Sequence, residues 1–232
     1  AICADLDSSP TPYHAVETVR VHLEASGFRP FAADAGPAGR WFHAEGGGII
    51  AWVVAEHHDA LSPLRIVGAH TDSPNLRIKP QPDVSTLGVA QLGVEVYGGA
   101  LTNSWLDRDL GLAGRVVVRS GDGLQVRLVR DDRPLLRVPQ LAIHLDAEFR
   151  SSGLNLNRQR HMVPMWGLGE APAFREYLAD QLSVGADDVV SWDMMAHDLS
   201  PARLAGLDDA FLVSSRLDNQ LSCFVATRSL LK

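Results

Sequence analysis

Two polar segments that each follow an apolar run contain residue types suited to metal chemistry. In the first, residues 68–74, His70 and Asp72 stand two positions apart after the apolar run 64–69. In an extended backbone this spacing directs both side chains to the same side. A neutral imidazole is a good zinc ligand, and a carboxylate commonly orients its second ring nitrogen. The alternative is a His and an Asp that only cap a turn before Pro74, since short His-x-Asp motifs are common by chance.

The second segment, residues 214–219, follows the apolar run 210–213. Its Asp218 could offer both carboxylate oxygens to two cations in a paired metal site. Asp is also a favoured N-cap, so Asp218 could instead only begin the last helix. Both segments place ligand-type residues after strands of one presumed sheet, where functional groups of α/β proteins gather.

Three other polar positions have simpler interpretations. His144 follows an apolar run and, taken alone, fits a structural histidine with its hydrogen bonds satisfied. Residues 56–59, Glu-His-His-Asp, form a polar turn, and residues 107–109, Asp-Arg-Asp, fit a local ion-pair cluster. Neither cysteine lies in a motif that supports a nucleophile.

The elements that must position these residues are readable from apolar periodicity. Thr11 caps a predicted helix with Pro12 at its first position, and Gly27 ends it. Residues 49–55 and 64–69 are short, continuous apolar runs rich in β-branched residues. They predict buried strands of a sheet covered on both faces.

The middle of the chain has a different pattern, with short Val- and Gly-rich runs separated by turns. Residues 120–123, Ser-Gly-Asp-Gly, predict a hairpin turn between two such runs. Helices are expected at 171–182 and 219–232, and strands at 189–195 and 210–213. We therefore predict an α/β fold, a mixed sheet with flanking helices interrupted by a β-rich insertion. The expected boundaries are 1–83 and 167–232 for the α/β domain and 84–166 for the insertion.

Composition excludes several classes of protein. The net charge is −7, which argues against a nucleic-acid-binding protein, and 46% apolar residues argue against disorder. No run is long enough to span a bilayer, and no signal peptide is visible at the start. With two cysteines and no disulfide framework, we expect a soluble cytoplasmic protein.

Several motifs in fixed order over nearly the whole chain resemble the aspartyl aminopeptidase family of dinuclear zinc exopeptidases. The stretches that carry this resemblance are 9–16, 68–74, 93–99, 105–110, 113–115, 141–145 and 216–219. The resemblance implies a cytosolic zinc aminopeptidase that removes Asp or Glu from peptide N-termini. Two Zn²⁺ ions would activate a water in each site, with Co²⁺ or Mn²⁺ as possible substitutes.

The resemblance also implies a role for each matching residue. His70 resembles the histidine ligand of one zinc, Asp72 the acidic residue that orients it, and Asp218 the carboxylate that bridges both ions. His144 resembles a histidine that the insertion of a neighbouring subunit contributes to the active site. The insertion would build dimers that assemble into a dodecamer, without a nucleic-acid or membrane partner.

Members of this family also use a Glu-Glu pair, a further Asp and a C-terminal His, and none of these can be matched here. We therefore expect the chain to be part of a longer polypeptide and to be inactive alone. The alternatives are a related dinuclear zinc amidohydrolase acting on acylated amino acids and a non-catalytic assembly subunit.

Overall fold

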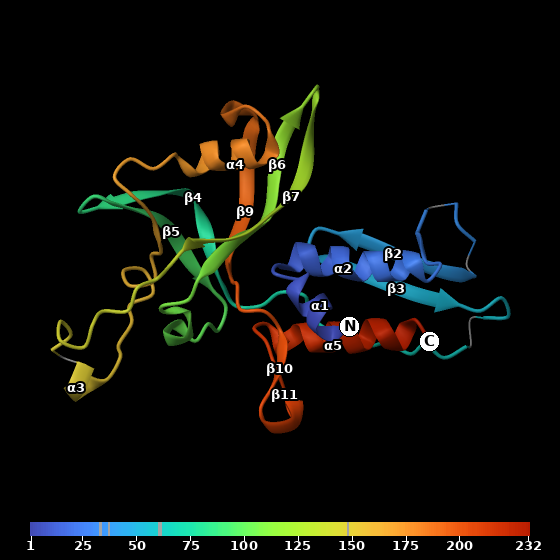
Figure 1. Cartoon of the computed structure of the whole chain (residues 1–232). Coiled ribbons are helices and arrows are strands. Elements are labelled where there is room, and N and C mark those ends of the chain that lie inside the picture. Colours follow the sequence, from blue (N-terminus) through green and yellow to red (C-terminus); the bar gives the residue numbers. More distant parts are fainter. Residues whose placement is uncertain (33, 37, 60–61, 148) are drawn as a thin grey trace. The chain divides into compact units, whose positions relative to one another are not determined.

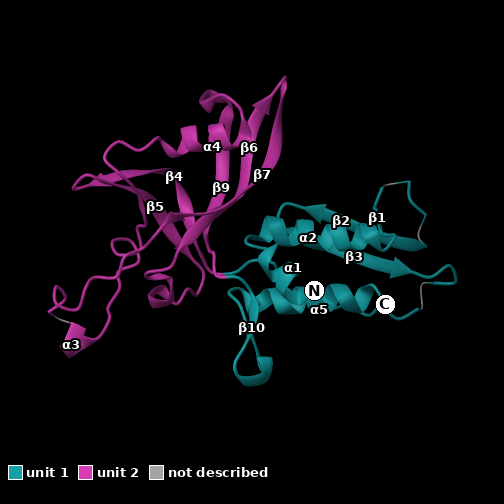
Figure 2. Cartoon of the chain, in the orientation of Figure 1, with its two compact units in different colours: residues 1–73, 201–232 teal, residues 74–200 magenta. Residues whose placement is uncertain are grey.

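The chain divides into two compact units in a computed structural model that describes residues 1–232 except 33, 37, 60–61 and 148. The first unit comprises Ala1–Ser73 and Pro201–Lys232, and the second comprises Pro74–Ser200 (Figures 1 and 2). The first unit is therefore interrupted by the second. Among the described residues, no helix is long and apolar enough to cross a membrane.

The first unit begins with two helices, α1 (Ile2–Asp7) and α2 (Pro12–Ala25). The Thr11 hydroxyl accepts a hydrogen bond from the backbone N–H of His14 at 3.4 Å, which satisfies a free donor at the start of α2. Gly27 follows the helix with φ +81°, a conformation that glycine adopts without strain. The predicted helix, its cap and its stop are confirmed, whereas α1 was not predicted.

A three-stranded sheet in the order β1-β2-β3 packs against α2. Strands β1 (Arg29–Pro30) and β2 (Gly39–Glu45) are parallel, and β3 (Gly48–Val54) is antiparallel to β2. Leu23 of α2 and Phe42 of β2 belong to the apolar cluster beneath the sheet. The last part of the unit contains β10 (Arg203–Ala205), η3 (Leu207–Asp209), β11 (Phe211–Val213) and α5 (Leu217–Leu230).

One predicted strand is wrong, and a second is less buried than expected. Residues 64–69 form no strand, and Leu64, Ile66 and Val67 are 74%, 86% and 74% exposed. Within the described part of the chain no strand pairs with this run, and β-branched residues become a strand only beside a partner. Residues 49–55 do form β3, but Ile50 is 66% exposed, so the sheet is not covered on both faces there.

The second unit is built on a six-stranded sheet in the order β7-β6-β9-β4-β5-β8, with every neighbouring pair antiparallel. Its strands are β4 (Asn75–Thr86), β5 (Val89–Tyr97), β6 (Leu110–Ser120), β7 (Gly123–Leu136), β8 (Met165–Leu168) and β9 (Val189–Asp198). The helices are η1 (Thr102–Trp105), α3 (Phe149–Ser152), α4 (Phe174–Leu182) and η2 (Ala186–Asp188). The predicted turn at 120–123 joins β6 to β7, with Ser120 opposite Gly123.

This unit is larger than the insertion predicted at 84–166. It begins at Pro74 because β4 already pairs with β5 and β9 from its first residues. It ends at Ser200 because β9 lies between β6 and β4, and because α4 packs on the same core (Figure 2). The helix and strand expected at 171–182 and 189–195 therefore belong to the β-rich unit. Local patterning identified both elements but carried no information about which sheet they would join.

Candidate functional site

Three of the predicted site residues meet in the first unit. The Nε2 atom of His70 lies 3.2 Å from Oδ1 of Asp218, a residue 148 positions later. The Nδ1 atom of His70 lies 3.0 Å from the backbone oxygen of Asp72 and 3.4 Å from its Oδ1. One imidazole is thus placed between two acidic residues, and all three side chains are open to solvent.

Hydrogen bonds from α5 hold the segment that carries His70. The Gln220 side-chain amide donates to the backbone oxygen of Thr71 at 2.6 Å, and Cys223 Sγ donates to that of His70 at 3.2 Å. Ser73 Oγ donates to the backbone oxygen of Asp218 at 3.1 Å. These contacts fix residues 70–73 against the start of α5 although 64–69 is not a strand.

The start of α5 is irregular in the backbone around Asp218. Arg216, with φ +63°, occupies the N-cap position, and no side chain there caps the helix. Asp218 itself has non-helical angles, φ −86° and ψ 107°, and is followed by a cis peptide bond to Asn219. Because Arg216 and not Asp218 holds the N-cap position of α5, the structure does not show Asp218 as the cap of this helix.

The donor set fits part of a zinc site. If Nδ1–H of His70 donates to Asp72, the lone pair of Nε2 faces an anionic oxygen of Asp218, and two acceptors meet at 3.2 Å. Tetrahedral zinc with Zn–N and Zn–O distances of about 2.0 Å would separate two ligand atoms by about 3.3 Å. A cation therefore suits this position, and so does an imidazolium, which would make ion pairs with both carboxylates. Within the described ranges, no group of three or more His, Cys, Asp or Glu could hold a metal ion.

Cys223 is held in its thiol form. Burial raises the pKa of its thiol, and the nearby Asp72 carboxylate raises it further. A thiol in that state contributes a hydrogen bond rather than nucleophilic attack, which agrees with the absence of a nucleophile motif in the sequence.

His144 lies in the second unit, whereas His70, Asp72 and Asp218 lie in the first. It lies in an exposed turn whose flanking residues Ile143 and Leu145 are 48% and 73% exposed. A buried structural histidine is therefore not what the structure shows at this position.

The remaining polar segments behave as their sequences predict. Residues 56–59 are exposed. In the 107–109 segment, Arg137 Nη1 lies 2.6 Å from Asp109, and Arg108 pairs with Asp198. Ion pairs at this segment are confirmed, although the partners Arg137 and Asp198 come from distant parts of the sequence rather than from within the segment.

Sequence reasoning missed the residues that position the site, namely Thr71, Ser73, Gln220 and Cys223. Gln220 is a polar side chain only 6% exposed, three positions before Cys223 on one helix face. The only sequence signal for this role was the spacing of Gln220 and Cys223, which places both on one face of the expected helix.

Comparisons with protein families and with curated relatives both point to one family of aminopeptidases. The family described as "Aminopeptidase I zinc metalloprotease (M18)" matches residues 6–232. A relative from Streptomyces coelicolor, "Probable M18 family aminopeptidase 2", is 49% identical over 231 residues, covering 97% of this chain and 53% of its own length. The chain therefore spans about half the length of the curated relatives it matches.

Solved structures agree with the fold. The structure titled "Cryo-EM structure of the Ape4 and Nbr1 complex" is 34% identical with a TM-score of 0.92, over 99% of this chain and 49% of that one. The "Structure of S. cerevesiae mApe1 dodecamer" is 22% identical with a TM-score of 0.81, over 99% and 54% of the two chains. The second likeness concerns the fold alone.

Proposed function

The chain belongs to the M18 family of aminopeptidases, and from this premise we propose that the polypeptide carrying it is a zinc aminopeptidase acting on peptides with an N-terminal Asp or Glu. The membership confirms the resemblance found in the sequence. The mixed α/β fold corresponds to part of the M18 structures. Hydrolysis, its acidic preference and the zinc content of this protein are the proposal.

The observation that carries the proposal is the approach of His70 Nε2 to Asp218 Oδ1 at 3.2 Å, with Asp72 behind the imidazole. In the proposed enzyme His70 and Asp218 hold metal, and Asp72 keeps a proton on Nδ1 of His70 so that Nε2 is free to bind. Zinc, when bound, lowers the pKa of a coordinated water and polarises the scissile carbonyl. Co²⁺ and Mn²⁺ accept the same nitrogen and oxygen ligands.

The complete site needs more groups than these. A catalytic zinc ordinarily has three protein ligands, whereas the cluster offers one imidazole and one carboxylate that face each other. The family resemblance implies that a Glu-Glu pair, an Asp and a His supply the general base and the other ligands. No such set is matched within these 232 residues, so we expect the residues that recognise an acidic side chain to lie elsewhere too.

The proposal includes assembly of identical subunits. A family structure is described as a dodecamer, and we propose that this protein also forms dimers that build a dodecamer in the cytoplasm. The second unit would make the dimer, and His144 would reach the active site of a neighbouring copy.

Replacement of His70 tests the metal site. In the polypeptide that contains these residues, we expect His70→Ala to lower bound zinc below two ions per subunit and to remove most hydrolysis of aspartyl substrates. Elemental analysis and turnover measure the two effects. His58→Ala, in the exposed turn 56–59, is the matched control and should leave both unchanged. Two retained ions with normal turnover would contradict the assignment, and a preference for acylated amino acids would favour the amidohydrolase alternative.

A further inference from the structure

The two candidate metal ligands lie on segments that no sheet of the described chain joins. Residues 63–73, which carry His70, form neither a helix nor a strand, and Asp218 stands at the irregular start of α5. The 3.2 Å between His70 Nε2 and Asp218 Oδ1 is therefore not set by a backbone ladder. It depends on side chains that join the two segments, and Thr71 lies at the centre of these contacts.

Thr71 is held through both its side chain and its backbone, and it stands between His70 and Asp72 in the sequence. Its hydroxyl donates to the backbone oxygen of Gly47 at 2.5 Å, and its own backbone oxygen accepts from the side-chain amide of Gln220 at 2.6 Å. A β-branched side chain has a restricted χ1 angle, so a bond from the Thr71 hydroxyl also orients the backbone that carries it. Two bonds in different directions thus fix the residue that joins the candidate ligand to its orienting acid.

The acceptor on Gly47 is itself well placed. Gly47 belongs to the turn that joins β2 to β3, where Gly46 reverses the chain with φ +56°, a conformation that favours glycine. A Cβ atom at position 47 would lie 3.1 Å from Cβ of Pro12, the first residue of α2. The turn therefore lies directly against the start of α2, which supports the oxygen that holds Thr71.

The second anchor of Thr71 moves with the other ligand. Gln220 stands two positions after Asp218 and is only 6% exposed, and burial of an amide is costly unless it is hydrogen-bonded. Its bond to Thr71 satisfies a buried donor, and Ser73 Oγ joins the same segments in the opposite direction by donating to the backbone oxygen of Asp218 at 3.1 Å. A shift of Thr71 would therefore change the separation of the two ligands.

We propose that Thr71 is a positioning residue for the metal pair, and that its two hydrogen bonds set the distance between the His70 imidazole and the Asp218 carboxylate. This inference rests on the metal site of the proposed function and assigns a support to it. Thr71 acts through the backbone rather than as a ligand, because its hydroxyl and carbonyl face Gly47 and Gln220. The motif at residues 9–16 thereby gains a role, since Pro12 supports the turn that holds Thr71.

A purely structural role for the Thr71 hydroxyl predicts a different outcome. Loss of the hydroxyl would then lower the stability of the fold and leave the zinc affinity of folded molecules unchanged. Thr18 provides the comparison within the same unit, since it is half-buried like Thr71 and its hydroxyl also donates to a backbone oxygen, that of Ser8 at 3.3 Å. The same substitution at both positions therefore separates positioning from stability.

Zinc affinity of the polypeptide that contains these residues, measured by competition with a chelator, is the first test. Thr71→Val keeps the branched shape and removes the donor, so we expect the dissociation constant of zinc to rise about 10-fold, the lower end of what loss of a group behind the ligands costs. Gln220→Met, which removes the other donor, should have a similar effect. Thr71→Ser keeps the hydroxyl and should restore most of the affinity, and Thr18→Val should leave it unchanged.

The geometry of the site gives a second measurement that stability alone would not change. Co²⁺ accepts the same ligands as zinc, and its visible absorption depends on how those ligands are arranged. With Co²⁺ at saturation, we expect the spectrum of Thr71→Val to differ from that of the wild type. The spectra of Thr71→Ser and Thr18→Val should match the wild type.

Wild-type zinc affinity and cobalt spectrum in a folded Thr71→Val variant would overturn this inference, and so would equal losses of affinity in Thr71→Val and Thr18→Val. If Thr71→Val does not fold, Gln220→Met decides in its place, because it removes the second bond to the same residue. Loss of zinc in His70→Ala alongside either result would leave the proposed metal site standing. Retention of two ions in His70→Ala would instead overturn the metal site, and this inference with it.

Discussion

Asp218 is the residue at which the metal-bridge and helix-cap interpretations differ most. Its carboxylate faces His70, and Arg216 occupies the cap position. A bridging carboxylate screens the repulsion between two dications, whereas an amide brings no charge to that position. Asn caps a helix about as well as Asp, so a capping residue would tolerate the exchange.

We therefore expect Asp218→Asn to remove at least as much activity as His70→Ala while the protein remains folded. Turnover of aspartyl substrates and metal content are the measurements, with circular dichroism as the check on the fold. Asp209→Asn, at an exposed position at the end of η3, is a suitable control. Wild-type activity in Asp218→Asn would defeat the metal assignment and support a structural role.

For single residues, the sequence identified candidate metal ligands but not the residues that hold them in place. His70 and Asp218 could be found because their residue types suit a metal and both follow apolar runs. The contacts of Gln220 with Thr71 and of Ser73 with Asp218 could not be found, because they join segments far apart in the chain. A hydrogen bond between distant segments leaves no periodic signal in either of them.

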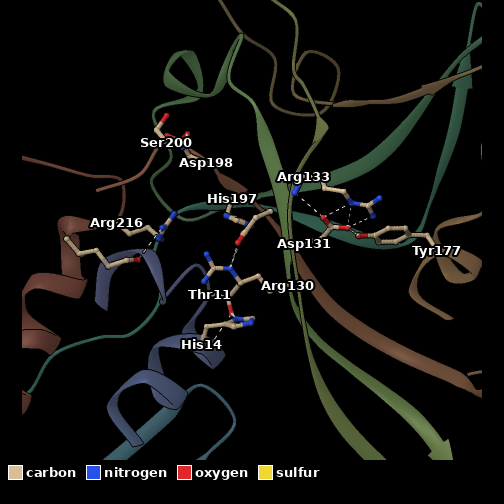
Figure 3. A network of polar contacts seen from close by, with 12 residues as sticks. Thr11, His14, Arg130, Asp131, Arg133, Tyr177, His197, Asp198, Ser200 and Arg216 are labelled. Carbon is tan, nitrogen blue, oxygen red and sulfur yellow. Dashed lines mark hydrogen bonds and ion pairs between the residues drawn. The ribbon is translucent and has the colours of Figure 1, made fainter. Parts of the chain in front are cut away.

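At the scale of elements, a buried carboxylate joins β7 to α4 in the second unit. Asp131 of β7 accepts hydrogen bonds from the guanidinium and backbone N–H of Arg133 and, at 2.8 Å, from the hydroxyl of Tyr177 in α4 (Figure 3). These bonds, the Arg133 side chain first, lower the pKa of Asp131 to about 2. Burial and the neighbouring Asp131 carboxylate raise the pKa of the Tyr177 hydroxyl, which stays protonated as the donor.

The lowered pKa makes the stability of this unit depend on acid pH. Because the pKa falls from 3.8 in the unfolded chain to about 2 in the folded one, the ionised form stabilises the fold above about pH 4. This contribution, about 2 kcal/mol, is lost as the pH falls from about 4 to about 2.

Asp131→Asn is accordingly expected to lower the free energy of unfolding by about 2 kcal/mol at pH 7, with the difference from wild type shrinking toward pH 2. Urea titrations followed by tryptophan fluorescence measure this, since the Trp166 ring lies 5.1 Å from that of Tyr177. Asp132→Asn, whose side chain is 54% exposed, is the neighbouring control and should have little effect. A difference that stays constant between pH 7 and pH 3 would contradict the account.

The same scale shows where prediction of the fold succeeded. Thr11, Pro12 and Gly27 mark the ends of α2, because helix caps depend only on residues within one turn of the end. Residues 120–123 form the predicted turn because turn formation also depends only on neighbouring residues. Residues 64–69 have the composition of a strand, yet a strand also needs a partner, which no local pattern can supply. The predicted boundary at 84 differs from the start of the second unit at Pro74 for a similar reason, since the membership of β4 depends on its pairing with β5 and β9.

At the scale of the whole molecule, the 232 residues are expected to be inactive when expressed alone. The cluster in the first unit offers one imidazole and one carboxylate, fewer than the three protein ligands of an ordinary catalytic zinc. Zinc-dependent hydrolysis of aspartyl substrates by this chain is the measurement, with the longest polypeptide of its reading frame as the active control. Turnover by the 232 residues, free of longer species, would show that the metal site has been misplaced.

Replacement of His144 tests whether one subunit completes the active site of another. His144 lies in an exposed turn of the second unit, and the cluster of candidate ligands lies in the first. In the proposed enzyme it donates a hydrogen bond to the carbonyl oxygen as negative charge develops there. His144→Phe should then lower turnover about 10²–10³-fold and leave metal content unchanged, because it removes a donor and no ligand.

Mixing of variants distinguishes this function from a local structural one. Oligomers containing both His144→Phe and His70→Ala subunits can pair an intact metal site on one chain with an intact His144 on another, so part of the activity should return. His70→Ala mixed with Asp218→Asn is the control, because these residues lie 3.2 Å apart in the same chain and mixing restores neither site. If subunit exchange is demonstrated and the first mixture stays inactive, His144 does not serve its neighbour. In that case His144 acts only within its own subunit. If it completed the active site of another copy, a subunit with an intact His144 would restore activity to the mixture.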